Sequence, residues 1–433
     1  MPASHPTFRE ALRFWLKLGL ISFGGPSGQI AIMHAELVEK KKWIGEERFL
    51  HALNFCMLLP GPEATQLATY CGWLLHRMWG GITAGVLFVL PSALLLWLLS
   101  YVYVAWGQVA WIAAGFDGLK PAVTAIVVAA VIRIGRHALK TWLLWALAAA
   151  AFAALFFFHV PFPAVITAAA AIGFAVGKFA PRWSPPTVPT GGGTGTAIID
   201  DRAAAPGHTR PSWARTFKVL AVSLVLWWAP VVAAGLWQGW SGVLAQQGFF
   251  FSKASMVTFG GAYAVLPYVG QQAVEHYGWL STAQMLDGLG LAETTPGPLI
   301  MVLQFVGFLG GWNRPGALSP LVAATLGAAM TTWTSFVPCF LWIFIGAPYI
   351  EQLRGNRHLS QALTAVTASV VGVILNLAVW FGLHVFLPAG GYINWFGIVV
   401  SAAAFVAMQH FKASIILIVL VAALLGVGRH VLF

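Results

Sequence analysis

Two Pro-Gly-Pro triplets interrupt apolar stretches of the chain, and they are the residues most able to build a binding site. They are Pro60-Gly61-Pro62 and Pro296-Gly297-Pro298. Proline lacks an amide hydrogen and glycine adopts backbone angles that other residues avoid, so each triplet must break a helix. The second proline suits the first turn of a new helix. Because a helix start presents unpaired N–H groups and about half a positive charge, the triplets predict an anion site.

Two further motifs add groups that an anion could use. Lys17 and Lys253 each lie six residues before a Phe-Gly-Gly motif, Phe23-Gly24-Gly25 or Phe259-Gly260-Gly261. Two helix starts offset about one negative charge, so we expect the lysines to supply the remainder for a dianion. Alternatively, both amines reach the membrane surface. The Phe-Gly-Gly backbone is expected to face the anion as an amide nest, or else its glycines only let helices pack closely.

Two carboxylates lie beside the triplets and are candidates for proton coupling. Glu63 follows Pro62 directly, and Glu293 comes three residues before Pro296. Protonating a carboxylate next to an anion site favours anion binding, so these residues would move proton and anion together. The alternatives are a first-turn acid that complements the helix dipole at Glu63 and a polar contact between helices at Glu293.

Composition places the chain among all-α, polytopic membrane proteins. Of its 433 residues, 59% are hydrophobic and only 9% are charged, which excludes a soluble globular protein. The net charge of +11 gathers in short loops between apolar segments, which indicates membrane orientation and not nucleic-acid binding. The three cysteines lack metal-ligand spacing, so neither a metal nor a cofactor is expected.

A tandem duplication is visible in the residue numbers. Phe23 and Phe259, Trp43 and Trp279, and Pro60 and Pro296 all differ by 236. Such repeats are typical of transporters with two related halves. The basic residues predict a cytoplasmic N-terminus, and one unmatched helix between the repeats would invert the second. The predicted organisation is an N-terminal transporter repeat at 1–180, a flexible cytoplasmic linker at 181–212, an extra transmembrane helix at 213–239 and a C-terminal transporter repeat at 240–433.

The order of motifs resembles the chromate transporter family in its long, two-domain form. The motifs are Phe23-Gly24-Gly25-Pro26, Glu39-Lys40-Lys41-Lys42-Trp43, Leu59-Pro60-Gly61-Pro62 and Leu90-Pro91-Ser92, followed by a second copy. The resemblance implies a protein of the bacterial inner membrane that exports chromate and confers chromate resistance, with sulfate as the isosteric relative. The second copy departs from the first at Ala262, which matches Pro26, and at Leu299, which matches Glu63.

Other functions remain open at this point. One is a general carrier for sulfate and other oxyanions, because chromate and sulfate are both tetrahedral dianions. Another is a membrane enzyme such as a chromate reductase, although the sequence has no Gly-rich dinucleotide motif and no Cys-x-x-Cys. We therefore expect a non-enzymatic transporter whose partners are the oxyanion and the lipid bilayer, with a homodimer left open.

Overall fold

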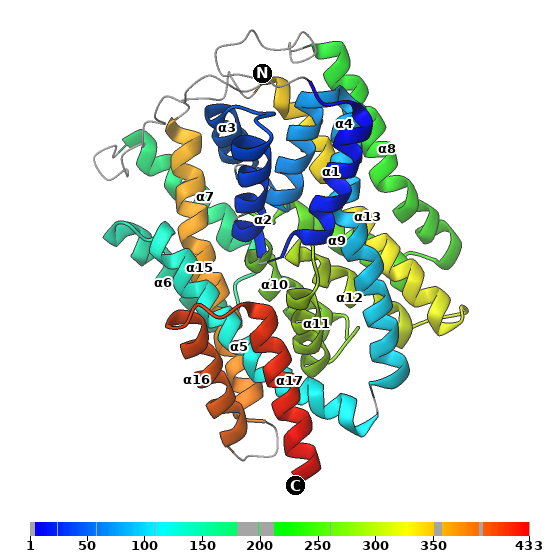
Figure 1. Ribbon diagram of the computed structural model, residues 1–433, viewed down its shortest axis with the longest axis vertical. Coiled ribbons are helices and arrows are strands. Elements are labelled where there is room, and N and C mark those ends of the chain that lie inside the picture. The colour runs from blue at the N-terminus through cyan, green and yellow to red at the C-terminus, as the bar shows by residue number, and fades with distance from the viewer. Residues whose placement is uncertain are drawn as a thin grey trace.

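The computed structural model is built of helices (Figure 1). It describes residues 5–23, 25–57, 59–107, 109–179, 198, 212–259, 261–349, 357–388 and 393–432. Seven helices in these ranges are long and apolar enough to cross a membrane. The predicted all-α, polytopic membrane fold is therefore confirmed.

The elements of the two halves follow one another in the same order. The first half contains α1 (Phe8–Ile21), α2 (Gly25–His34), η1 (Ala35–Lys40), α3 (Glu46–Cys56), α4 (Glu63–Trp106), α5 (Ala110–Ala138), α6 (Trp142–Phe156) and α7 (Phe162–Phe179). The second contains α9 (Val243–Met256), α10 (Ala262–Gln271), η4 (Gln272–His276), α11 (Thr282–Thr294), η5 (Leu299–Met301), α12 (Val302–Asn313), α13 (Pro320–Gly346), η6 (Ala347–Tyr349), α15 (Arg357–Phe386), α16 (Trp395–Gln409) and α17 (Ile415–Leu432). Between them lies α8 (Trp213–Gln238).

The duplication extends to single backbone hydrogen bonds. In the first half η1 is a π-helix, and the amide of Trp43 closes it by donating to the carbonyl of Leu37 at 2.8 Å. In the second half η4 is also a π-helix, and Trp279 donates to Ala273 at 2.8 Å. Both pairs differ by 236 in residue number. The two halves are therefore copies of one local fold.

The broken segments of the first half fold as helical hairpins. Helix α1 has 14 residues, which is about 21 Å and shorter than the roughly 30 Å of bilayer hydrocarbon. Helix α4 bends at His76 and Arg77, where the helical backbone is interrupted. His76 Nε2 lies 2.9 Å from the carbonyl oxygen of Pro6, so the bend returns to the side where α1 begins. Phe23 and the turn at 60–62 therefore lie at the far end of these hairpins from Pro6 and His76.

The second half forms the same hairpins from the other side. Asn313 Nδ2 donates to the carbonyl of Trp279 at 2.8 Å, which brings the end of α12 back to the segment before α11. In Figure 1, α3 lies toward the end of the molecule that holds the N-terminus, and α11 lies toward the end that holds the C-terminus. The two repeats thus have inverted orientation, as the sequence predicts.

The repeats exchange their last helices. Helices α6 and α7 pack on α15 of the second repeat, and α16 and α17 pack on α5 of the first. Small residues allow close approach: a Cβ added at Gly118 would lie 2.1 Å from the carbonyl oxygen of Ala422, and one at Gly426 would lie 2.1 Å from that of Ala114. Neither repeat can therefore complete its packing alone.

The division of the chain into domains stays a prediction. Helix α8 occupies the region of the expected extra helix. The predicted linker, 181–212, lies outside the described residues apart from Ile198 and Ser212.

Inverted repeats predict that matched surface positions face opposite sides of the membrane. Glu39 and Glu275 differ by 236, and both are exposed. We expect Glu39→Cys and Glu275→Cys to react with a membrane-impermeant maleimide from opposite sides. The unmodified chain is the control, because Cys56, Cys71 and Cys339 are buried. Labelling of both variants from one side would contradict the inverted arrangement.

Candidate functional site

Each Pro-Gly-Pro turn is hydrogen-bonded to the other repeat. The amide of Gly61 donates to the carbonyl of Thr258 at 2.7 Å, and the amide of Gly297 donates to the carbonyl of Ser22 at 2.8 Å. Thr258 and Ser22 come directly before the two Phe-Gly-Gly motifs. Each Pro-Gly-Pro turn is thus bonded to the residue directly before the Phe-Gly-Gly motif of the other repeat, so the two bonds cross between the repeats.

The two residues whose carbonyls accept these bonds also use their hydroxyl groups to bond to the preceding helix. Ser22 Oγ donates to the carbonyl of Leu18 at 2.6 Å, and Thr258 Oγ1 donates to that of Ala254 at 2.7 Å. These bonds satisfy a carbonyl near the end of α1 and of α9 and leave the main-chain oxygens of Ser22 and Thr258 for the opposite repeat. Ser22 and Thr258 were not among the predicted site residues. The signal that could have identified them is a hydroxyl residue directly before each Phe-Gly-Gly motif.

The two central glycines cannot be replaced without strain. Their φ angles are +121° at Gly61 and +96° at Gly297, a region that other residues avoid. A Cβ on Gly61 would lie 3.0 Å from Cys339 Sγ, and one on Gly297 would lie 2.6 Å from Cβ of Ser92. Ser92 in α4 and Cys339 in α13 thus take corresponding places beside the turns, and both turns are tightly enclosed.

Main-chain amides next to the turns are the donors that an anion could use. The amides of Glu63, Ala64 and Thr65, at the start of α4, donate to no protein acceptor within the described ranges. The same holds for Leu299 and Ile300 at the start of η5. These amides form the positive end of their helix dipole. The prediction that the breaks present helix starts thus agrees with this geometry.

Buried polar side chains surround the turns. Gln29 Nε2 donates to the carbonyl of Gly297 at 2.5 Å, and Gln66 Nε2 donates to that of Pro60 at 2.8 Å. Their Oε1 atoms, like Ser92 Oγ and Thr65 Oγ1, are buried and find no partner among the described residues. Such atoms are costly in an apolar interior. These four residues were not among the predicted site residues, although polar residues inside apolar segments are themselves a signal of function.

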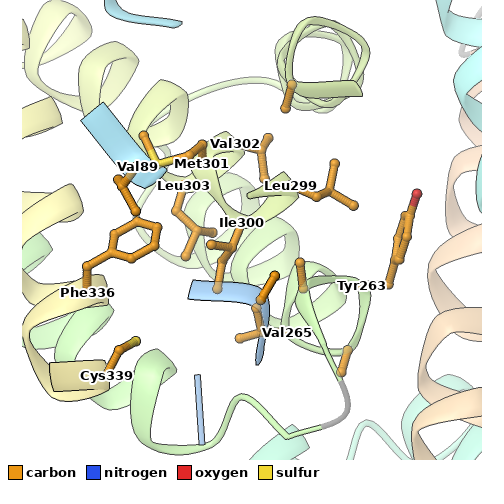
Figure 2. Close-up of a cluster of buried hydrophobic side chains, with 14 of the residues drawn as sticks. Val89, Tyr263, Val265, Leu299, Ile300, Met301, Val302, Leu303, Phe336 and Cys339 are labelled. Carbon is orange, nitrogen blue, oxygen red and sulfur yellow. The ribbon is translucent and has the colours of Figure 1, made fainter. Parts of the chain in front are cut away.

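Apolar side chains form a cluster around Leu299 to Leu303, directly after the second Pro-Gly-Pro turn. Figure 2 shows Ile300 and Leu303 near its centre, with Val89 and Phe336 on one side and Val265 on another. Leu299, which matches Glu63 of the first repeat, is 3% exposed and belongs to the cluster. The two halves of the site are therefore unlike: the first offers a carboxylate and the second offers hydrocarbon.

The two candidate lysines lie on α1 and α9. Lys17 and Lys253 are both exposed, and neither amine lies within 4.0 Å of a carboxylate in the described ranges. On α9, Lys253 shares an exposed stripe with Phe249 and Met256. This exposure agrees with the alternative in which the amines reach the membrane surface. A role for them in binding stays a prediction, and Gly24 and Gly260 lie outside the described residues.

The two candidate carboxylates have different surroundings. Glu63, the first residue of α4, is half-buried. Glu293 in α11 is buried, and the hydroxyl of Tyr263 donates to its Oε1. Arg133 of α5 interacts electrostatically with both Glu293 and Tyr263. Glu293 therefore makes a polar contact between α10 and α11, in agreement with the alternative that the sequence left open.

Comparison with known proteins identifies the family. The family model described as chromate transporter matches residues 9–174 and 245–427. The chain belongs to the chromate transporter family. The segment between the two matched regions contains the predicted linker and α8.

Relatives with this family name cover most of the chain. The chromate transport protein of Pseudomonas aeruginosa is 34% identical over 86% of this chain and 80% of its own length. The chromate transport protein of Cupriavidus metallidurans is 29% identical over 86% and 82%, and the probable chromate transport protein of Synechococcus elongatus is 28% identical over 87% and 86%. No solved structure matches the chain significantly. The resemblance seen in the motifs is thus confirmed.

The enclosure of Gly297 predicts a specific loss of function. We expect Gly297→Ala to reduce both the yield of folded protein and transport, because its Cβ would overlap Ser92. Adding Ser92→Gly should restore part of the yield by removing that overlap. Size-exclusion chromatography in detergent and thermal unfolding measure the yield and stability.

Gly316 provides the matched control for backbone strain. Its φ is +62°, but a Cβ there would meet nothing within 4 Å. Gly316→Ala should therefore cost only the backbone strain, about 1–2 kcal/mol. If Gly297→Ala and Gly316→Ala behave alike, the enclosure of the Pro-Gly-Pro turn has no special importance.

Proposed function

We propose that this chain exports chromate across the bacterial inner membrane and thereby confers chromate resistance. Its membership of the chromate transporter family supports the substrate, since three relatives of nearly full length are named as chromate transport proteins. The observation that carries the mechanism is the pair of crossed hydrogen bonds at Gly61 and Gly297, which hold two helix starts against one buried region.

The proposed site lies between the helix starts of α4 and η5. Unpaired amides and hydroxyls bind a tetrahedral oxyanion through its oxygens, as helix N-termini bind phosphate and sulfate. The residues that form it are those of the four motifs: Phe23, Gly24, Gly25, Pro60, Gly61, Pro62, Phe259, Gly260, Gly261, Pro296, Gly297 and Pro298. Lys17 and Lys253 remain proposed contributors of positive charge, and Glu63 and Glu293 remain proposed sites of proton coupling.

The proposed orientation has the N-terminus in the cytoplasm. Arg77 lies at the bend of α4, which His76 ties to Pro6 near the N-terminus. Lys40, Lys41 and Lys42 end the first hairpin on that same side. An excess of basic residues on one side of the membrane favours the cytoplasm for that side.

The membrane potential is sufficient to drive outward movement of a dianion. When the cytoplasm is negative relative to the outside, the free energy of moving two negative charges outward is favourable by about 4.6 kcal/mol per 100 mV. Export driven in this way needs no nucleotide.

A flux measurement tests the proposal. Inverted membrane vesicles expose the cytoplasmic face, so we expect them to take up radiolabelled chromate when the lumen is made positive. Uptake should rise with the size of the potential and should be absent in vesicles without the protein. If a positive lumen does not stimulate chromate uptake by the purified, reconstituted protein, export driven by the membrane potential is wrong.

A general oxyanion carrier is the second candidate, and the chemistry of the site favours it. Backbone amides recognise the charge and size of a tetrahedral dianion and have no contact with its central atom. Excess sulfate in the same vesicles separates the two functions. Strong competition, with equal uptake of labelled sulfate, would identify a general carrier, whereas chromate uptake that sulfate leaves unchanged would identify a chromate transporter.

A further inference from the structure

A second group of charged residues joins the repeats away from the Pro-Gly-Pro turns. Asp287 lies in α11 of the second repeat, while Lys120 and Asp117 lie in α5 of the first. Tyr103, near the end of α4, donates its hydroxyl to Asp287 Oδ2 at 2.9 Å. We name these four residues the Asp287 cluster. None of them belongs to the proposed oxyanion site.

One ammonium group serves two carboxylates in this cluster. Lys120 Nζ lies 2.6 Å from Asp117 Oδ1 and 4.0 Å from Asp287 Oδ1. Asp287 Oδ1 is buried and accepts no hydrogen bond within the described residues. An ionised carboxylate in such a place lacks the partners that usually stabilise it. The cluster carries a net charge of about −1 when both acids are ionised, and one proton on Asp287 neutralises it.

The cluster also offers a route for that proton. The side chain of Asp117 is 71% exposed, that of Lys120 is 21% exposed and that of Asp287 is 5% exposed. The exposed fraction of the side chain thus falls stepwise from Asp117 through Lys120 to Asp287. Tyr103 is held in place by ring contacts with Phe116 and Phe305, at 4.9 Å and 5.3 Å between centroids.

In the part of the chain that the structure describes, the elements that pack most closely on α11 bring no further ionisable group to Asp287. These elements are α4, α5, η5, α12 and α17. Tyr103, Lys120 and Asp117 are the groups that interact with Asp287. Helix α12 and η5 contain no ionisable side chain, and the basic residues of α17, Arg429 and His430, lie in its last turn.

The cluster is present on one side of the pseudo-symmetric molecule. The residue that matches Asp287 in the first repeat is His51, at the offset of 236. Close to Lys120 the offset is 240, so its match in the second repeat is Ser360. A carboxylate facing an ammonium group is therefore not part of the repeated fold, and structural duplication does not explain it.

We propose that Asp287 binds the proton that this transporter moves together with its oxyanion, with Lys120 as the counter-charge and Tyr103 as a positioning residue. The proposal rests on the proposed oxyanion transport and names its coupling. With Asp287 ionised, the negative cluster beside the interface opposes entry of an anion. With Asp287 protonated, Lys120 pairs with Asp117, the cluster is neutral and the anion is accepted.

Accumulation of chromate in proteoliposomes tests the coupling. The membrane potential is clamped at zero with valinomycin and equal potassium, and a pH gradient is imposed with the acid on the side of the added chromate. For one proton per oxyanion we expect the accumulation ratio to change about tenfold per pH unit. Asp287→Asn should abolish this dependence, so that its residual flux is the same at every gradient. Glu275→Gln, an exposed acid on the same repeat, is the control and should behave as the unmodified protein does.

A second variant keeps the proposal testable if Asp287→Asn does not fold. Asp117→Asn removes the competing carboxylate, so Lys120 should hold ionised Asp287 more firmly. The cluster is then neutral even with Asp287 ionised, so flux should persist at alkaline pH, where the unmodified protein loses it. A normal pH response in Asp287→Asn, or flux of the unmodified protein that ignores the pH gradient, would overturn the coupling and leave oxyanion transport standing. No chromate flux under any gradient would overturn the proposed function itself.

Discussion

The fold depends on finding hydrogen-bond partners for the backbone groups that are left free where helices are interrupted. Irregular backbone survives at membrane depth only where protein or water satisfies it. Here the amide of Gly61 is satisfied by Thr258, and that of Gly297 by Ser22. Each repeat thus supplies the acceptor that the other needs. The breaks that would destabilise a single repeat become the contact that holds two repeats together.

The exchange of C-terminal helices follows the same logic. Because α7 packs on α15 and α17 packs on α5, the long helices of one repeat position the hairpins of the other. A shift of one repeat relative to the other must change the crossed hydrogen bonds and the Asp287 cluster together. The Pro-Gly-Pro turns and the Asp287 cluster thus both lie at contacts between the repeats, and two sites that share such contacts can be coupled.

Local patterns in the sequence were sufficient for the repeat, the helix breaks and the inverted orientation. Pro, Gly and aromatic residues at a constant offset act on their own backbone, so their consequences can be predicted without knowing their neighbours. The pairing of partners could not be predicted, because it joins residues far apart: Tyr103 and Asp287 are separated by 184 positions. The sequence left two placements open for Lys17 and Lys253, because the period of a helix alone does not tell which face meets protein, and both side chains are exposed.

Charge balance explains why the two halves of the site differ. Two helix starts offset about one negative charge, so a dianion between them leaves about one charge unpaired. An ionised Glu63 at the start of α4 adds to this unpaired negative charge. A second carboxylate at position 299 would add further negative charge. Leu299 occupies that position, and its burial in the apolar cluster favours the asymmetric arrangement. Besides a contribution from Lys17 or Lys253, which lie on exposed faces, a proton on a nearby acid would reduce this unpaired charge, and a proton is the smallest cation that can do so.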